Sequence, residues 1–416
     1  MRWVLLLPLA LTSAVASSAV AQVSRDTTRA DSTKADSTKA DTTAIDTTAA
    51  AASEDTTEAH SAPWRTSYFP YLTSGANDGP VLAARVRYFQ PAPYEARTTA
   101  TASATLDAGI SGRGSRFVTG VFRAPGLWKN WRLGVLASAD RQARYGYFGL
   151  GENTIYNKNL RSDSIPFPYR VRRTRYRGVV ELTRVIRGPF MAAFQLNVEQ
   201  VRFTSLPGPS AFTADVPSGE LEQNDAAGRL ALIYDTRDNE YNTHQGLLLE
   251  VGTQVASGGP GNGYTRQYGI FRGWLQVREG TVVAARVAGS GMGGRPTLNA
   301  RFTLPGWEST VPVLGGQYSH RSLDTGRLTG SGVLFGNLEV RHDLLSLGDL
   351  GGITLIAFTD AGRVFEKEHF RLTTKDMKWG GGGGFAIRIL RSGILTFDFA
   401  GGPDGFNFSV GNGWTF

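Results

Sequence analysis

The C-terminal end of the chain constrains its fold more than any other segment. Residues 406–416 read F-N-F-S-V-G-N-G-W-T-F, so apolar and polar side chains alternate up to a terminal Phe416. A period of two is the pattern of a β-strand with two different faces. An outer-membrane barrel ends in such a strand, which closes the sheet and places an aromatic side chain at the lipid interface. We therefore expect Trp414 and Phe416 to lie at that interface.

The N-terminus predicts export. Arg2 precedes a short apolar run over residues 3–11, and Ala19-Val20-Ala21 has the small-residue pattern of a cleavage site. The run is too short for a membrane-spanning helix, which needs about 20 residues. We therefore expect residues 1–21 to be a signal peptide that is removed from the mature chain.

Three C-terminal residues extend this prediction to a location. The spacing of Gly411, Trp414 and Phe416 resembles the C-terminal sorting signal of bacterial outer-membrane proteins. With the export signal, it predicts the bacterial outer membrane as the location. It also implies that the cell's barrel assembly machinery is a partner during biogenesis.

The composition favours a membrane barrel over a bundle of membrane-spanning helices. Hydrophobic residues make up only 41% of the chain, which suits a barrel because only alternate residues of each strand meet lipid. The 51 Gly suit many tight turns, and the 22 Phe, 14 Tyr and 8 Trp suit aromatic girdles. The formal charge of +8 is compatible with nucleic acid. Export instead predicts outer-membrane lipid, lipopolysaccharide phosphates or an anionic solute, and no nucleic acid, as the partner.

Residues 22–63 form a low-complexity segment. The unit A-D-S-T-K occurs at residues 30–34 and 35–39 and then decays into D-T-T units. Such a segment has little apolar surface to bury, so we expect a disordered periplasmic spacer, with a tether as the alternative. From Trp64 the sequence becomes aromatic and alternating. The outer-membrane β-barrel is therefore predicted over residues 64–416.

Two-faced strands follow one another through the predicted barrel. In one of them Phe194, Leu196 and Val198 alternate with polar residues, and the phase then changes at Val201 and Phe203, which predicts a bulge. Polar residues occupy the opposite face of too many strands for a soluble sandwich. A closed barrel removes the sheet edges and places those residues in its lumen. The predicted fold is all-β, a transmembrane antiparallel up-and-down barrel.

The connections between strands alternate between short and long, as periplasmic turns and extracellular loops do. Because bacterial single-chain barrels have an even number of strands, we predict 16, with 14 and 12 as alternatives. Short connections are predicted at residues 90–93, 125–129, 187–189 and 278–280, and long ones near 144–168, 205–223 and 295–330.

Ordered motifs in the C-terminal part of the chain point to one family. Residues 234–239 read Y-D-T-R-D-N, and four further segments follow in order: L-G-G at 314–316, G-N-L-E-V-R at 336–341, F-T-D-A-G-R-V-F at 358–365 and five glycines at 380–384. This series resembles the BamA/TamA-type bacterial surface antigen superfamily, strongly over residues 225–416 and by pattern alone over 64–224. The matching strand–turn–strand signature comprises Asp235, Thr236, Arg237, Asp238 and Gly246, with Asn242 where the pattern usually has proline.

The resemblance implies both a fold and a function. It implies a barrel with a long loop folded into its lumen, and a role in outer-membrane biogenesis or in translocation of protein or lipid. Assembly factors of the family carry periplasmic POTRA domains before the barrel, and residues 22–63 are too few for one such module. We therefore expect a POTRA-less member, with separate periplasmic proteins as candidate partners. A passive porin-like channel for small solutes is the alternative, and a barrel hydrolase is a third hypothesis.

Arg321 is the central candidate site residue. The family carries R-G-aromatic at the tip of its inserted loop, where this chain has Arg321-Ser322-Leu323. An arginine in a confined lumen needs an anionic partner, and in the family the loop arginine docks against acidic lumen residues. The resemblance therefore implies that Arg321 pairs with Glu339 or Asp360 and holds the loop as a plug. A solvated arginine with unrelated carboxylates is the alternative.

A run of arginines follows one of the predicted long loops. Arg170, Arg172, Arg175 and Arg177 are expected near the outer rim, where guanidinium groups would contact lipopolysaccharide phosphates. With Arg173, the run does not fall on a single face of the strand. A solvated stripe inside the lumen is therefore the alternative.

The sequence gives little support for catalysis. It has no Cys, and its five His are not in H-E-x-x-H or another metal-ligand spacing. No G-x-S-x-G motif accompanies His342-Asp343, and Gly380–Gly384 lacks the Lys-Ser/Thr ending of a phosphate-binding loop. We predict a protein that is not an enzyme, with no catalytic residues, no metal and no cofactor.

Overall fold

The computed structural model describes residues 62–75, 79–93, 96–258, 263–307, 309–365, 373–390 and 393–416. The predicted signal peptide and nearly all of the low-complexity segment therefore lie outside the described residues. The first strand, β1, begins at Arg65, next to the predicted start of the barrel domain at Trp64.

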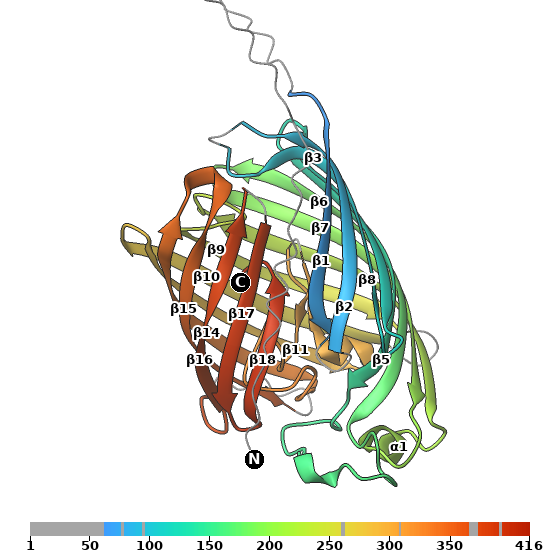
Figure 1. Cartoon of the computed structure of the whole chain (residues 1–416). Helices are drawn as coiled ribbons and strands as arrows, with labels where there is room; N and C mark the ends of the chain where they lie inside the picture. The colour runs from blue at the N-terminus through green and yellow to red at the C-terminus, as the bar shows by residue number, and fades with distance from the viewer. Residues whose placement is uncertain are drawn as a thin grey trace, which may run out of the picture. The chain divides into compact units, whose positions relative to one another are not determined.

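Sixteen antiparallel strands form one sheet in which each strand pairs with its neighbours in the sequence. Figure 1 shows these strands curving into a barrel. The predicted all-β fold and the predicted strand number are both confirmed. The strands are β1 (Arg65–Gly75), β2 (Gly79–Pro91), β3 (Ala100–Ser111), β4 (Arg116–Trp128), β5 (Trp131–Gly146), β6 (Arg170–Arg187), β7 (Phe190–Ser205), β8 (Glu220–Asp235), β9 (Gly246–Ser257), β10 (Gly263–Arg278), β11 (Thr281–Gly294), β14 (Gly332–Ser346), β15 (Gly351–Phe365), β16 (Lys378–Ile389), β17 (Gly393–Gly402) and β18 (Gly405–Asn412).

The longest connections all lie at one end of the barrel. They join β5 to β6 (147–169), β7 to β8 (206–219) and β11 to β14 (295–331), as the sequence predicted. We call residues 295–331 the inserted loop. Turns such as 188–189 and 279–280 lie at the other end, although the connection predicted to be short at residues 90–93 spans residues 92–99.

Among the described residues, short helices and strands occur only within the connections between barrel strands. No helix in this part of the chain is long and apolar enough to cross a membrane. The elements are η1 (Lys158–Leu160), α1 (Ala211–Asp215), η2 (Asn299–Phe302), β12 (Thr303–Leu304), β13 (Val311–Pro312) and η3 (Gly348–Leu350).

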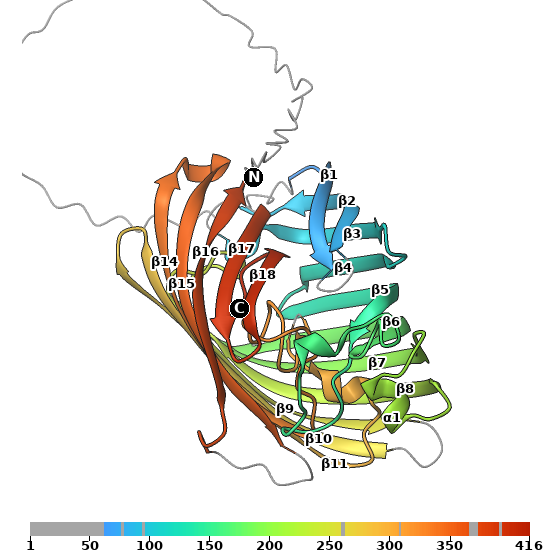
Figure 2. The same cartoon turned by 60° about the horizontal axis from the view of Figure 1, so that its bottom comes forward.

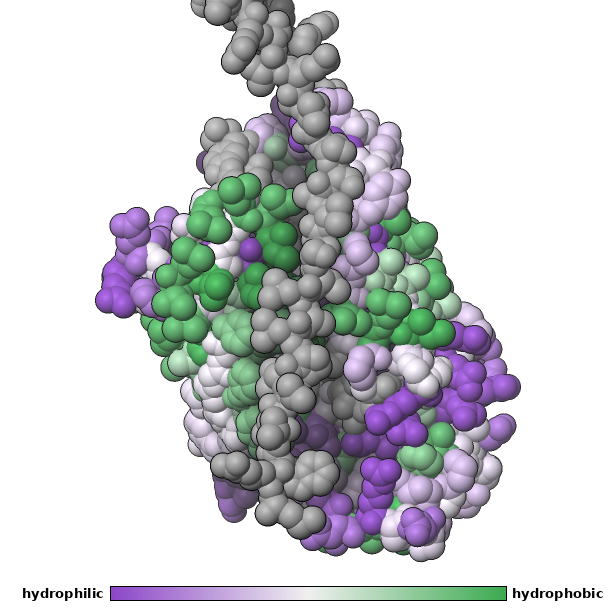
Figure 3. Space-filling model, viewed as in Figure 1, coloured by the Kyte–Doolittle hydropathy of each residue, from purple (hydrophilic) through white to green (hydrophobic). Residues whose placement is uncertain are grey.

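Outward-facing and inward-facing side chains alternate along each strand. On β7, the exposed Phe194, Leu196 and Val198 face outward, and Figure 3 shows hydrophobic residues gathered on the visible strand wall, with hydrophilic ones toward the end that carries α1. The predicted bulge at Val201 and Phe203 is wrong, because β7 keeps one continuous register with β8 there. These two residues face inward and are apolar because they belong to a core cluster inside the barrel.

The largest apolar core lies inside the barrel, between the strand wall and the inserted loop. Buried leucines of the loop, among them Leu314, Leu323 and Leu328, share one cluster with Phe335 of β14 and Val364 of β15. Figure 2 shows the loop within the ring of strands. Burial of this apolar surface stabilises the loop in the lumen.

The two ends of the sheet, β1 and β18, lie next to each other without pairing. Every other neighbouring pair of barrel strands has a hydrogen-bonded ladder, and the described residues show none between β1 and β18. The expectation that the last strand closes the sheet is therefore wrong for this structure. We refer to this place as the β1–β18 seam.

The last residues of the chain turn into the lumen. β18 ends at Asn412, and the ring of Phe416 lies 6.4 Å from that of the inward-facing Trp274 of β10. Arg341 of β14 lies 4.3 Å from the centre of the Trp414 ring. The predicted position of Trp414 and Phe416 at the lipid interface is therefore wrong, because cationic side chains in the lumen attract the faces of both rings.

Candidate functional site

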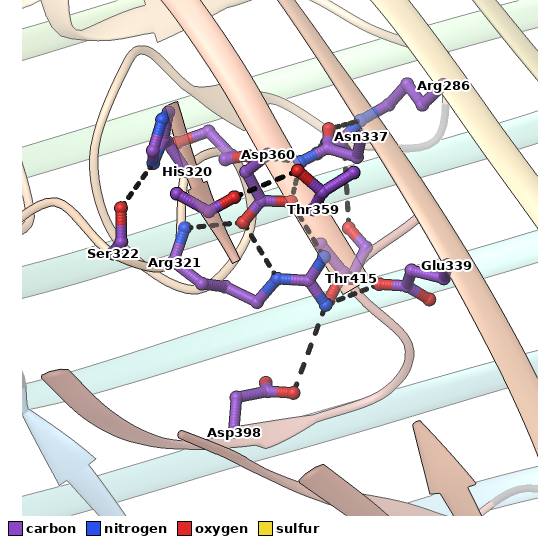
Figure 4. Close-up of polar contacts among 12 residues, drawn as sticks. Arg286, His320, Arg321, Ser322, Asn337, Glu339, Thr359, Asp360, Asp398 and Thr415 are labelled. Carbon is purple, nitrogen blue, oxygen red and sulfur yellow. Dashed lines mark hydrogen bonds and ion pairs between the residues drawn. The ribbon is translucent and has the colours of Figure 1, made fainter. Parts of the chain in front are cut away.

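Arg321 of the inserted loop lies at the centre of a buried group of charges, drawn in Figure 4. Its Nη1 lies 2.5 Å from Glu339 Oε1, and its Nη2 lies 2.8 Å from Asp360 Oδ1. Its Nε and its backbone amide both donate to Asp360 Oδ2, at 3.0 and 2.8 Å. Arg321 is only 2% exposed. The structure thus brings together the three residues that the sequence singled out.

Three strands position the acidic side chains around Arg321. Glu339 of β14, Asp360 of β15 and Asp398 of β17 all occupy buried, inward-facing positions of an alternating strand pattern. Asn337 is the direct cross-strand partner of Asp360 and donates to its Oδ1 at 2.7 Å. Asp398 Oδ1 is more distant, 3.9 Å from Arg321 Nη1. The strand register therefore places several carboxylate acceptors at one point of the lumen.

The C-terminal tail contacts the same arginine. Thr415 Oγ1 accepts a hydrogen bond from Arg321 Nη1 at 3.2 Å. Arg286 of β11 donates to the Thr415 carbonyl at 3.3 Å and to the Tyr318 carbonyl of the loop at 2.8 Å. We call Arg321, Glu339, Asp360, Asp398 and Thr415 the Arg321 cluster. It joins the inserted loop to three strands and to the end of the chain.

Charge compensation offsets the burial of Arg321 and Glu339. Glu339 accepts from two arginines, because Arg341 Nη2 lies 2.7 Å from its Oε2. Burial by itself would lower the pKa of Arg321, but Glu339 and Asp360 outweigh it and hold that pKa above its ordinary value. Removal of Arg321, Glu339 or Asp360 would leave an uncompensated buried charge, which is costly.

Two glycines make room for the loop beside Arg321. A Cβ built at Gly380 of β16 would lie 2.0 Å from Ser322 Oγ, and one at Gly402 of β17 would lie 2.2 Å from the same atom. Ser322 stands where the resemblance leads us to expect glycine. Its hydroxyl fits because the facing strand positions carry no side chain.

His320, on the other side of Arg321, is fully buried and also bonds to a strand. Its Nε2–H donates to the Lys378 carbonyl at 2.9 Å, and its Nδ1 lies 3.2 Å from Ser322 Oγ. Burial lowers the pKa of His320 below 6.5, and the neighbouring Arg321 acts in the same direction. A neutral imidazole is therefore the form that fits this position.

A second group of charges anchors the other arm of the inserted loop. Trp307 donates from its backbone amide to Glu250 Oε2 at 2.7 Å and from its Nε1 to Thr183 Oγ1 at 3.1 Å. Glu250 in turn accepts from Arg229 Nη1 at 2.7 Å and from the Tyr268 hydroxyl at 2.6 Å. The loop is thus bonded to β6 and β9 as well as to β14 and β15.

The family signature stabilises the turn between β8 and β9. Asp235 is buried and accepts from Arg237 Nε and Nη2, both at 3.0 Å, while Asp238 accepts from the backbone amide of His244 at 3.1 Å. Thr236 Oγ1 accepts from the Leu247 amide at 3.0 Å. Gly246 has a φ of +110°, and a Cβ there would lie 2.4 Å from the Thr236 carbonyl. The turn therefore requires glycine at this position.

The basic run of β6 is divided between the two faces of the strand. Arg175 Nε donates to Asp140 Oδ1 at 2.8 Å, and Arg177 Nη1 donates to Thr310 of the inserted loop at 3.2 Å. Arg175 and Arg177 therefore face the lumen, and their assignment to lipopolysaccharide was wrong. The parity of an alternating strand explains this, since Arg173 also faces inward.

The other two arginines of the run behave differently. Arg170 lies at the rim of the barrel, where its Nη2 is 3.5 Å from Asp324 Oδ2 of the inserted loop. Arg172 lies on the outward side of β6, between the buried Val171 and Arg173. Of the four residues predicted to contact lipopolysaccharide, Arg172 is the one whose position on the strand faces the membrane side.

Several members of the site were not singled out from the sequence. Asp398 carried a usable signal, because it alternates with Phe397 and Phe399 and so had to face the lumen. Thr415 and Trp307 carried none, since their contacts depend on how the tail and the loop turn. Asn242 departs from the family pattern, and its Oδ1 accepts from Trp414 Nε1 at 3.0 Å.

Comparisons with known proteins agree with this geometry. A family model described as Omp85 superfamily domain matches residues 102–414. The solved structure of BamA from Haemophilus ducreyi lacking POTRA domains 1–3 has a TM-score of 0.52 and 13% identity, covering 84% of this chain and 70% of that one. CdiB from Escherichia coli has a TM-score of 0.54 and 12% identity, covering 84% of this chain and 61% of its own. No curated protein matches the chain.

The fold and the inserted loop define an outer-membrane β-barrel whose lumen is occupied by one of its own connections. The chain belongs to the Omp85 superfamily, because the family model covers most of its length. The resemblance to BamA/TamA-type barrels is therefore confirmed. The two solved structures support the fold, and this chain spans less than two thirds of CdiB.

Proposed function

We propose that this barrel serves outer-membrane biogenesis, or translocates protein or lipid, and that the inserted loop is a plug held by the Arg321 cluster. On this proposal the chain acts by binding and by conformational change, and not by catalysis. Its substrate would pass through the lumen or the β1–β18 seam when the plug moves.

One observation carries the proposal: Arg321 and Gln317 join the loop to strands in the last part of the sheet and to the tail that follows the seam strand β18. Arg321 bonds to Asp360 of β15 and to Thr415 of the short tail after the seam strand β18. The side-chain Nε2 of Gln317, also in the loop, donates to Thr396 Oγ1 of β17 at 2.7 Å. A movement of the loop would therefore act on β17 and β18 as well, where the described residues show no ladder to β1.

A separate periplasmic protein is the candidate partner on this proposal. The described residues comprise the barrel and its connections, and they contain no α/β module of the POTRA type. On this proposal an accessory protein would present the substrate to the lumen from the end with the short turns. The cell's barrel assembly machinery would act earlier, when this chain is itself inserted.

Depletion of the protein in its own bacterium tests the proposal. We expect other outer-membrane barrels, surface lipopolysaccharide, or both, to fall as the protein is depleted. Wild-type protein supplied in trans should restore them, and a variant with the plug cross-linked in place should not. Unchanged levels of both, with reduced uptake of small solutes instead, would favour a passive porin-like channel.

A further inference from the structure

Two arginines face each other on the outer surface of the barrel. Arg116 of β4 and Arg141 of β5 are direct cross-strand partners. Both lie on the outward face, since Val118 and Ala139, two residues along each strand, are exposed there and are also partners. Like charges directly opposite each other destabilise a sheet unless an anion lies between them.

The protein supplies no such anion among the described residues. Neither Arg116 nor Arg141 has an ion pair with a described carboxylate, and Arg141 Nε is buried without a hydrogen-bond partner. Thr174 of β6 is the next partner in the same row, and it leads to Arg202 of β7. Arg202 is different, because its Nη2 lies 2.6 Å from Glu222 Oε2. Arg172, also outward on β6, adds a third cation without a described carboxylate partner.

An apolar groove lies directly beside these arginines on the same outward face. Its volume is about 880 Å³, and it crosses the strands from β4 to β9. Val118, Tyr176 and Val198 project around it, while Ala137 and Gly178 leave space in its floor. Val118 and Ala139 are two residues from Arg116 and Arg141, which corresponds to about 7 Å along a strand. The groove and the charges therefore lie within the span of one amphipathic molecule.

The position of this face in the membrane indicates which kind of ligand it would bind. The arginines lie close to the strand ends that carry the long connections, such as that between β5 and β6. Long connections face the cell exterior in outer-membrane barrels. The groove is therefore expected at the outer leaflet, where a ligand would combine acyl chains with a phosphate group.

We propose that this face binds the lipid A part of lipopolysaccharide. Arg116 and Arg141 share one of its phosphates, with Arg172 nearby, and one acyl chain lies in the groove. Guanidinium groups suit this role because they donate two parallel hydrogen bonds to phosphate oxygens. The site differs from the one expected from the sequence, which included Arg175 and Arg177 of the lumen.

Native mass spectrometry of the full chain in detergent, titrated with purified lipid A, tests the proposal. The variant R116Q/R141Q should bind lipid A roughly tenfold to a hundredfold more weakly, because each arginine near an anionic headgroup contributes to affinity. A137F fills the groove without adding charge and should also weaken binding. The matched controls are R184Q, an outward arginine at the opposite end of β6, and A357F, an outward alanine of β15. Both should bind as the wild type does.

Further probes separate lipid A from other ligands. Lipid A without phosphates, and phosphatidylglycerol, should both bind more weakly than lipid A, and inorganic phosphate should not compete with it. Equal adducts in R116Q/R141Q and wild type would overturn the proposal. Phosphatidylglycerol binding as tightly as lipid A would overturn the assignment to lipid A, and complete competition by inorganic phosphate would overturn the role of the groove. Heat-modifiable mobility in gels checks that each variant is folded.

Discussion

The arginines inside this barrel and those on its outer wall have different kinds of partner. Inside, Arg321 bonds to Glu339 and Asp360, and the protein itself balances its charge. Outside, Arg116 and Arg141 face each other, and no described carboxylate pairs with either. The partner of an arginine in this barrel can therefore come from the chain or from the surrounding membrane. Removal of the charge should therefore have opposite effects on stability at the two places.

The largest expected effect is that of Arg321→Ala. Two buried carboxylates would lose their main cation, so the free energy of unfolding should fall by about 3–5 kcal/mol. Urea unfolding of the detergent-solubilised protein, followed by heat-modifiable mobility, measures it. Arg202→Ala is the matched control, because its pair with Glu222 is exposed and screened by solvent, so its loss should be much smaller. Equal losses in the two variants would remove the distinction between buried and exposed arginines.

Substitution of two aspartates of the cluster should lower the free energy of unfolding by different amounts, both smaller than that for Arg321→Ala. Asp360 accepts from Arg321 at three nitrogens and from Asn337, so Asp360→Asn should cost about 2–3 kcal/mol of unfolding free energy. Asp398 lies 3.9 Å from Arg321, and its Oδ1 has no hydrogen-bond partner, so Asp398→Asn should change stability by less than about 1 kcal/mol. The same urea unfolding measures both, and a larger loss for Asp398→Asn would show that Asp398, and not Asp360, is the main partner of Arg321.

The stability of the loop should also depend on pH through His320. Its pKa in the folded protein is lowered below 6.5 by burial, so protonation favours the unfolded state. The contribution is present above pH 6.5 and is lost as the pH falls below that value. Unfolding measured from pH 7.5 to 5 should show this decline in wild type and a shallower one in His320→Gln. Identical slopes in the two proteins would mean that other groups cause the pH dependence.

The smallest expected effect is that of Arg116→Gln. In detergent without lipid A, relief of the repulsion with Arg141 should leave stability unchanged or raise it by up to about 0.5 kcal/mol. The sign is opposite to that expected for Arg321→Ala. A clear loss of stability without added lipid would indicate that the protein itself provides a partner for Arg116.

Much of the barrel could be predicted from the sequence, because alternation and family motifs are local signals. The strand number, the three longest connections and the meeting of Arg321 with Glu339 and Asp360 all came from such signals. The apolar Val201 and Phe203 were misread as a bulge because strand pattern alone does not show that a lumen can be apolar where a loop fills it. The parity of Arg175 and Arg177 is a local signal too, because both share a strand face with Arg173, and this face is the lumen face.

Other features depend on relations that a sequence does not display. Arg116 and Arg141 lie opposite each other only because of the β4–β5 register, which includes an irregularity between Ala124 and Trp128. The inward turn of Trp414 and Phe416 depends on Arg341 and Arg286, which lie on distant strands. In both cases the residues come into contact only through the strand register or the path of the chain end, and the sequence alone does not display either.

Single-channel conductance in planar bilayers tests most directly the claim that Arg321 holds the inserted loop as a plug. We predict that the wild-type barrel conducts rarely or not at all, and that Arg321→Ala shows frequent, large openings under the same voltage. Steady large channels in the wild type, or equally quiet records from both proteins, would contradict the account.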